Sequence, residues 1–191
     1  MAVRPITIIG HKALHQSTKK VKEITSEVRT LVADMFDTMD AAKGAGLAAN
    51  QVGVRLRIFV FDCADDSEVD QRGVVINLVL EKGTVLPGDP SPESGLEGCL
   101  SLPGEHFPTP RSNWARVTGT DLDGKEMVVE AHGGMLARCL QHETDHLDGK
   151  LYIERLTPRY RAQARDAMKA RGWEAAHLTK WDPSTQGAET V

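Results

Sequence analysis

Two histidines with a glutamate beside the first stand in the segment Leu140–Gly149, LQHETDHLDG. In a helix, His142 and His146 are four residues apart and share one face, where both imidazoles can bind one metal ion. Glu143 completes an H-E-x-x-H pattern, in which the glutamate acts as a general base. The same spacing also occurs in helices with two unrelated histidines, so the surrounding residues decide between a metal site and chance.

Residues 135–147 have the apolar spacing of a helix that could carry this motif. The apolar residues on or near one stripe are Met135, Leu136, Cys139, Leu140 and Leu147. Gly133 and Gly134 precede the segment, and Gly149 stands where a C′ glycine would end it. Imidazole nitrogens beside an apolar stripe would be half-buried, which is costly unless a metal ion or a hydrogen bond satisfies them. The context therefore favours a metal site.

The spacing does not fix the third ligand. A catalytic site of this kind takes three protein ligands and keeps one position for water. In a thermolysin-like endopeptidase an acidic ligand lies downstream of the second histidine, where Glu154 and Glu174 are candidates. His177 would serve a three-histidine variant. None of these residues stands in a motif that is typical of such a site.

An upstream candidate is Cys99, in the stretch Glu97-Gly98-Cys99-Leu100-Ser101. It lies between small and polar residues rather than inside an apolar run. The alternative for any single cysteine is a buried packing residue, and that interpretation fits Cys63 and Cys139 better. Three cysteines are also an odd and sparse set, which favours a reducing compartment over a disulfide framework.

The elements that must position these residues begin with a helix and two strands. Residues 24–39 have a helical apolar period, and the glycine-rich stretch KGAGLAANQVG follows them. Residues 56–62 and 74–80 are rich in branched and aromatic side chains, as β-strands are.

A hairpin and a final helix lie farther along the chain. Asp123-Gly124 predicts a turn between strands at 117–122 and 126–130. Thr157-Pro158 predicts the start of a helix at about 158–171. This order of elements predicts an α+β fold, with mostly antiparallel β-sheets around the central H-E-x-x-H helix and helices toward the N- and C-terminal ends.

Composition narrows the class of protein. The chain has 191 residues with 40% hydrophobic content, which suits one domain with a sizeable core. Its formal net charge is −4, so overall charge gives no reason to expect nucleic-acid binding. No apolar run approaches the roughly 20 residues that span a membrane, and the N-terminal stretch does not have the pattern of a secretory or transit peptide. We therefore expect a cytoplasmic protein.

Three motifs in order resemble the peptide deformylase family, the metalloenzymes that remove the formyl group from the N-terminal methionine of new bacterial polypeptides. The stretch 44–51, GAGLAANQ, is similar to the family's glycine-rich motif, with a small residue at Ala45. Residues 97–101 match its E-G-C-L-S, and residues 142–146 match its H-E-x-D-H. The resemblance spans roughly residues 4–160, although the segment between Glu81 and Glu97 is longer and richer in proline than the family pattern.

The resemblance implies a set of metal ligands and a mechanism. Cys99, His142 and His146 would bind one divalent ion, Fe²⁺ in the cell, with Zn²⁺, Ni²⁺ or Co²⁺ able to substitute. A metal-bound hydroxide would attack the formyl carbon, with Glu143 as general base. The Gln51 side chain would stabilise the negative charge on the formyl oxygen.

The resemblance also implies a second donor and a peptide-binding site. The backbone N–H of Leu100 would join Gln51 in stabilising the charge. Gly46 and Gly98 would offer backbone groups to an extended peptide, which would bind like an added strand. Glu97 would order the cysteine loop. Asp145 lies near a helix C-terminus, where a carboxylate is unfavourable, so we expect an arginine partner; Arg111 and Arg116 are both candidates.

The domain boundaries and the binding partners of the protein can be predicted from the sequence and the family resemblance together. Residues 1–172 would form a single catalytic domain, and residues 173–191 a loosely ordered tail. The substrates would be N-formylmethionyl nascent peptides. The final helix has a basic face, which is more typical of a solvated surface but could contact the ribosome. Its basic residues are Arg159, Arg161, Arg165, Lys169 and Arg171.

Three other functions compete with this interpretation. A zincin-type endopeptidase would need the downstream ligand that no motif supplies. A catalytically silent binding relative is disfavoured because every chemical position is intact. A protein that docks on nucleic acid or the ribosome would depend on the basic final helix alone.

Overall fold

Helices and strands are distributed along the whole chain in the computed structural model, which describes residues 2–91, 95–173, 180–185 and 187. Within these residues the helices are α1 (Ser26–Ala41), α2 (Gly134–Leu147) and α3 (Pro158–Arg171), with 3₁₀ helices η1 (Lys12–His15), η2 (Ala49–Val52) and η3 (Tyr152–Glu154). The strands are β1 (Ile6–Thr7), β2 (Gly46–Ala48), β3 (Ile58–Ala64), β4 (Asp70–Lys82), β5 (Leu96–Cys99), β6 (Leu102–Pro108), β7 (Trp114–Thr120), β8 (Glu126–His132) and β9 (Lys180–Trp181).

A five-stranded antiparallel sheet forms one side of the molecule, in the order β2-β3-β4-β7-β8. The predicted strand 56–62 overlaps β3, and the predicted strand 74–80 lies within β4. The predicted hairpin joins β7 and β8, and Gly124 in its turn has a φ of +75°. That positive φ is the reason a glycine is favoured there.

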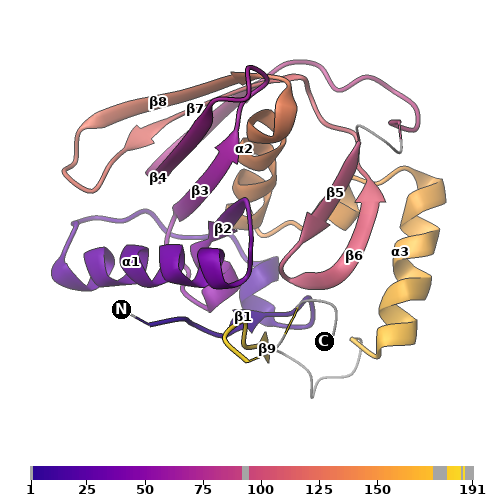
Figure 1. The fold of residues 1–191 in the computed structure, drawn as a ribbon, viewed down its shortest axis with the longest axis horizontal. Coiled ribbons are helices and arrows are strands. Elements are labelled where there is room, and N and C mark those ends of the chain that lie inside the picture. Colours follow the sequence, from indigo (N-terminus) through magenta and orange to yellow (C-terminus); the bar gives the residue numbers. More distant parts are fainter. Residues whose placement is uncertain (1, 92–94, 174–179, 186, 188–191) are drawn as a thin grey trace.

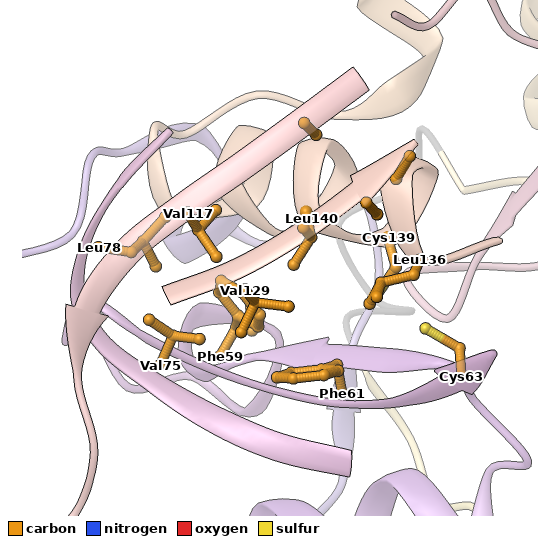
Figure 2. Close-up of a cluster of buried hydrophobic side chains, with 14 of the residues drawn as sticks. Phe59, Phe61, Cys63, Val75, Leu78, Val117, Val129, Leu136, Cys139 and Leu140 are labelled. Atoms are coloured by element: carbon orange, nitrogen blue, oxygen red, sulfur yellow. The ribbon is translucent and has the colours of Figure 1, made fainter. Parts of the chain in front are cut away.

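Helix α2 packs on the inner face of this sheet. Four residues of the apolar stripe expected from the sequence, Leu136, Cys139, Leu140 and Leu147, are buried against the sheet, and Figure 2 shows the first three facing side chains of the strands. The fifth, Met135, is instead 57% exposed. The sheet residues labelled around the buried stripe are Phe59, Phe61, Val75, Leu78, Val117 and Val129. The packing leaves the opposite face of α2, which carries the histidines, turned toward the rest of the chain.

A second sheet, the β5–β6 hairpin, stands on the other side of α2, with α3 beyond it (Figure 1). A second apolar cluster lies here and contains residues from β1, β5, β6, α3 and β9. The central helix therefore lies between two antiparallel sheets, as the α+β prediction requires. No helix in the described part of the chain has the length and apolar character needed to cross a membrane.

The third sheet pairs the two ends of the chain. Ile6 in β1 lies opposite Trp181 in β9, and Thr7 lies opposite Lys180. Trp173 and Trp181 are both buried in the second apolar cluster. The prediction of a loosely ordered tail is therefore wrong for Trp173 and for the β9 strand, because the indole rings gain apolar burial there. The remaining tail residues, 174–179, 186 and 188–191, lie outside the described part.

Helix α1 ends in a motif that matters for the loop after it. The N–H of Gly44 donates to the carbonyl of Met39 (2.9 Å), and the N–H of Lys43 donates to the carbonyl of Asp40 (3.1 Å). These two bonds form a Schellman motif. Lys43 occupies its left-handed position with a φ of +53°, which glycine would adopt at lower cost. The motif directs the chain into the GAGLAANQ stretch.

Candidate metal centre

The three predicted ligands converge on one point. The ligand atoms of Cys99, His142 and His146 all lie within 4.8 Å of one another, and all three residues are buried. Cys99 Sγ is 3.1 Å from His146 Nε2, which is 3.2 Å from His142 Nε2. Ligands about 2.0–2.3 Å from one ion in a tetrahedral site lie roughly 3.3–3.8 Å apart, so this spacing fits a bound cation. One thiolate and two imidazoles are also a donor set that divalent transition metals accept.

Glu97 orients the first histidine. Its Oε1 lies 2.7 Å from His142 Nδ1, so the ring nitrogen that faces Cys99 and His146 is Nε2. A carboxylate behind a histidine fixes the tautomer and strengthens the ring nitrogen as a ligand. His146 differs, because its Nδ1 is buried with no hydrogen-bond partner among the described residues. The sequence suggested only that Glu97 orders the cysteine loop. The structure shows that it also contacts and orients His142.

A buried ion network surrounds Glu97. Arg111 donates to Glu97 Oε1 from Nη2 (2.7 Å) and to Asp145 Oδ2 from Nη1 (2.6 Å). Arg155 donates to Asp145 Oδ1 (2.5 Å), and Arg138 donates to Glu97 Oε2 (3.2 Å). The network links the β5 strand to helix α2 through the guanidinium groups of Arg111 and Arg138.

The arginine partner of Asp145 was left open between Arg111 and Arg116. Arg111 is the partner, whereas Arg116 lies 3.9 Å from Glu130 on the sheet surface. Arg155 is a second partner that sequence reasoning missed. The sequence pattern does not predict this contact, because it depends on how the segment after α2 turns back and returns Arg155 to the side of Asp145.

The two buried glutamates of the site differ in pKa. Burial by itself would raise the pKa of Glu97, but Arg111 and the hydrogen bond with His142 outweigh burial and hold that pKa well below its ordinary value. Burial raises the pKa of Glu143 to about 7. Glu143 Oε2 has no hydrogen-bond partner within the part of the chain that is described. Glu97 is therefore a fixed anion, and Glu143 is a carboxyl group whose proton can move near neutral pH.

Glu143 lies against the glycine-rich stretch. A Cβ atom added to Gly46 would be 2.6 Å from Glu143 Oε1 and 2.7 Å from Cys139 Sγ. Only a glycine leaves room at this position, because backbone and carboxylate approach each other closely. Gly46 therefore lies beside the predicted general base.

Gln51 faces the predicted metal ligands with a defined orientation. The N–H of Ala48 donates to its side-chain oxygen Oε1 (2.8 Å). Because the oxygen is used in this way, the amide nitrogen Nε2 points toward Ser101 Oγ (3.3 Å) and Cys99 Sγ (3.8 Å). The side-chain N–H groups of Gln51 thus face the centre, and their role toward the formyl oxygen stays a prediction.

Leu100 follows the cysteine in the turn between β5 and β6. Its carbonyl accepts a hydrogen bond from Trp181 Nε1 (2.8 Å), and the N–H of Ser101 donates to Cys99 Sγ (3.3 Å). Sequence reasoning missed Trp181, which lies far along the chain from the motifs. No spacing signal could have found it.

A cleft of about 1330 Å³ opens in front of these residues. Gly46 and Gly98 line it, together with the exposed apolar side chains of Leu86, Leu96 and Met135. A Cβ atom on Gly98 would lie 2.4 Å from Cδ2 of the exposed His106 ring, which would have to move to make room for it. A cleft with an apolar wall, an open strand edge and a group of metal ligands at its floor suits an extended peptide.

Of the competing ligands, Glu154 does not join the centre. Glu154 Oε1 accepts the N–H of Leu151 (2.9 Å) within η3 and is not among the converging ligand residues. Glu174 and His177 lie outside the described residues. Cys63 and Cys139 are free and buried in the apolar cluster beneath α2, although Cys139 also lines the cleft.

Comparison with known proteins agrees with the motifs. A family model of polypeptide deformylases matches residues 3–162. The chain is 51% identical over 190 residues to a peptide deformylase of Mycolicibacterium paratuberculosis, covering 96% of this chain and 95% of the relative. It is 49% identical over 189 residues to a peptide deformylase of Rhodococcus opacus, covering 97% and 95%.

Solved structures show the same fold. A crystal structure of a peptide deformylase from Legionella pneumophila has a TM-score of 0.76 at 34% identity, covering 92% of this chain and 99% of that one. A peptide deformylase from Ehrlichia chaffeensis in complex with actinonin also has a TM-score of 0.76 at 34% identity, covering 90% and 98%.

Proposed function

The chain belongs to the polypeptide deformylase family and is an enzyme of that family, and from this premise we propose that it removes the formyl group from the N-terminal formylmethionine of newly made polypeptides. The observation that carries the proposal is the convergence of Cys99, His142 and His146 at the floor of a cleft, with Glu143 beside them. The products would be formate and a peptide with a free α-amino group. The reaction would take place in the cytoplasm.

Cys99, His142 and His146 would hold one divalent ion, which we propose is Fe²⁺ in the cell, with Zn²⁺, Ni²⁺ or Co²⁺ able to substitute. When bound, the ion would supply a Lewis acid that makes water more acidic and polarises the formyl carbonyl. The buried Glu97 would keep His142 protonated at Nδ1, which leaves the lone pair of Nε2 free to bind the ion.

Glu143 would move the proton. Its carboxylate would take a proton from the attacking water, hold it, and pass it to the departing amine nitrogen. Its pKa of about 7 suits a group that must both accept and release a proton near neutral pH. The absence of a hydrogen-bond partner at Oε2 among the described residues leaves that oxygen available to substrate or water.

Gln51 and Leu100 would stabilise the charge that develops on the formyl oxygen. The Nε2 donors of Gln51 and the backbone N–H of Leu100 would donate to it, and one such donor contributes roughly 3 kcal/mol in acyl-transfer enzymes. Gly46 and Gly98 would offer backbone groups to the peptide, which would lie along β5 as an added strand.

A ribosome contact through α3 belongs to the same proposal. Its five basic side chains are exposed, and Arg161 and Arg171 are already engaged with backbone or side-chain acceptors. Charge reversal of Arg165 and Lys169 should reduce co-sedimentation with ribosomes by a measurable fraction at low salt, while formate release from a free peptide stays unchanged. Equal co-sedimentation of both proteins would refute the contact.

The test of the reaction is anaerobic purification with metal analysis, followed by assay of a formyl-Met peptide beside an unformylated peptide with internal bonds. We expect one metal equivalent and formate from the first peptide only. Cleavage inside the second peptide without formate would instead indicate an endopeptidase. Cys99→Ser should lose metal and activity, whereas Cys63→Ala, in the apolar cluster between the sheet and α2, should keep both.

The iron assignment has a test of its own. A thiolate ligand and Fe²⁺ are both oxidisable, so the iron enzyme should lose activity in air. The same protein loaded with Ni²⁺ or Co²⁺ should keep its activity under the same exposure. Equal survival of all three forms would argue against iron as the native ion.

A further inference from the structure

The turn that carries Cys99 and Leu100 is not one that a hairpin favours by itself. Cys99 pairs with Leu102, so Leu100 and Ser101 form a two-residue connection between β5 and β6. The favoured connections of this length need a positive φ at one or both central residues, and neither Leu100 nor Ser101 has one. The ladder also shifts register between Gly98 and Cys99. Contacts from outside the hairpin must therefore help to fix the turn.

Those contacts come from β1 and β9, the two ends of the chain. The turn lies directly above this small sheet in Figure 1. From β9, Trp181 Nε1 donates to the carbonyl of Leu100 (2.8 Å). From the residues after β1, the N–H of Ile9 donates to the carbonyl of Ser101 (3.0 Å). Each bond holds one carbonyl of the turn.

The bond from Trp181 has a consequence on the other side of the same peptide group. In a planar trans peptide the C=O and the N–H point in opposite directions. With the carbonyl of Leu100 held by Trp181, the N–H of Ser101 points the other way, toward Cys99 Sγ at 3.3 Å. Rotation of this peptide by half a turn would aim a carbonyl oxygen at the sulfur, where it would repel a thiolate.

Thr7, on the partner strand β1, contacts Gln51, the other predicted donor to the formyl oxygen. Its hydroxyl Oγ1 donates to the backbone carbonyl of Gln51 (3.0 Å), and Thr7 is fully buried. The β1–β9 pair therefore contacts both the turn after Cys99 and the 3₁₀ helix that carries Gln51. Trp181 lies beyond residue 162, where the match to the family model ends.

We propose that Trp181 is a positioning residue, which fixes the Leu100–Ser101 peptide so that its N–H supports the sulfur of Cys99 and the preceding N–H of Leu100 keeps its direction. The inference rests on the proposed function for the role of Leu100. Its effect on Cys99 is independent of the substrate. It should therefore show in metal binding as well as in turnover.

The chain offers a matched control in Trp173. Trp173 and Trp181 are 1% and 3% exposed, and both lie in the same apolar cluster. The indole nitrogen of Trp173 has no hydrogen-bond partner among the residues described. Trp173→Phe and Trp181→Phe thus remove similar buried volume, but only the second removes a hydrogen bond to the turn.

The experiment measures Co²⁺ affinity by chelator competition, together with kcat and KM for a formyl-Met peptide, in both variants and the unaltered protein. Trp181→Phe should weaken Co²⁺ binding and lower kcat, each by about tenfold, because partners behind a ligand contribute about 10–100-fold. KM should stay within about twofold, since the groups along β5 that bind the peptide remain. Trp173→Phe should change none of the three values.

Equal Co²⁺ affinities in the two variants would overturn the proposal, and so would a rise in KM with kcat unchanged. If Trp181→Phe does not fold, the benzothiophene analogue of tryptophan at position 181 keeps the bicyclic shape and removes only the N–H. This analogue should show the same changes in Co²⁺ affinity, kcat and KM as those expected for Trp181→Phe. If the unaltered protein releases no formate while Co²⁺ affinity still falls in the Trp181 variant, the proposed reaction fails and the positioning role stands.

Discussion

Helix α2 and the β5–β6 hairpin each supply residues to the candidate metal centre, but they are held in place by different means. His142 and His146 share a face of α2 because of helical geometry, and the opposite stripe of α2 is buried on the five-stranded sheet. Cys99 precedes a two-residue turn whose carbonyls are bonded by Trp181 and Ile9, residues from the two ends of the chain. The helix side, which is α2 with His142 and His146, is fixed by helical periodicity and by packing on the sheet. The turn side, which is the β5–β6 hairpin with Cys99, is fixed by hydrogen bonds from residues far away in the sequence.

Glu97 and Arg111 join the two sides. Glu97 lies on β5 and contacts His142 on α2, while Arg111 contacts both Glu97 and Asp145. The helix and the hairpin are thus joined both by direct contacts of Glu97 with α2 and by the buried guanidinium group of Arg111. Four substitutions can test how far the two sides depend on each other, from the largest expected effect to the smallest.

The largest effect is expected from Arg111→Met, which removes the shared link. Glu97 and Asp145 would keep buried charges with fewer partners, and breaking a buried pair in this way costs about 3–5 kcal/mol of unfolding free energy. Chemical denaturation measures the loss. Arg116→Met is the control, because Arg116 is 40% exposed and 3.9 Å from Glu130, and it should cost no more than about 0.5 kcal/mol. Similar losses in both variants would show that Arg111 does not link the two sides.

Glu143→Gln should lower the rate of the reaction without changing the contacts that hold the helix side or the turn side in place. The amide keeps the shape of the side chain but cannot accept the proton, so kcat should fall by a factor of at least about 10². Metal content should stay at one equivalent, because Glu143 is not among the converging ligands. Metal analysis and single-turnover formate release check the two expectations. Joint loss of metal and activity would make Glu143 a ligand or a structural residue.

Glu97→Gln tests the support that passes from the turn side to the helix side. The substitution weakens the acceptor at His142 Nδ1, and loss of such a partner lowers metal affinity by about 10–100-fold. Chelator competition with Co²⁺ gives the value. Glu97→Gln and the unaltered protein are measured in the same buffer, so that the pH dependence of Co²⁺ affinity does not enter the comparison. Unchanged affinity would mean that packing alone orients His142.

The smallest effect is expected from Lys43→Gly, outside both supports. Lys43 has a φ of +53° at the end of α1, a conformation that costs a non-glycine residue roughly 1 kcal/mol. The variant should gain about that much unfolding free energy, while metal affinity stays unchanged. As the control, Ala33→Gly in the interior of α1 should lower the unfolding free energy by about 1 kcal/mol. A loss of stability in Lys43→Gly would show that the lysine side chain makes a stabilising contact that outweighs the strain.

Much of the helix side could be predicted from the sequence. The boundaries of α2 followed from its apolar stripe and flanking glycines, and the β7–β8 hairpin followed from Asp123-Gly124. These signals are local, because the residues that decide the structure lie within one helical turn or one hairpin. The family resemblance supplied the ligand set and the roles of Gln51 and Leu100.

The turn side could not be predicted in the same way. Strands β5 and β6 contain Gly, Pro and charged residues without clear alternation, and they become strands because they pair with each other. The chain from Trp173 onward had no pattern, yet Trp173 and Trp181 are buried in the second apolar cluster, and Trp181 bonds to the turn.

The sequence by itself determined which residues have metal-binding chemistry and which two of them share a helix face, since residue type and helical period are properties of a short segment. Only the tertiary structure decided that Arg111 and Arg155 hold Asp145, that Glu97 orients His142, and that Trp181 holds the carbonyl of Leu100. These contacts join residues from different elements. Their formation depends on how the sheets pack around α2, and no periodicity in the sequence records that packing.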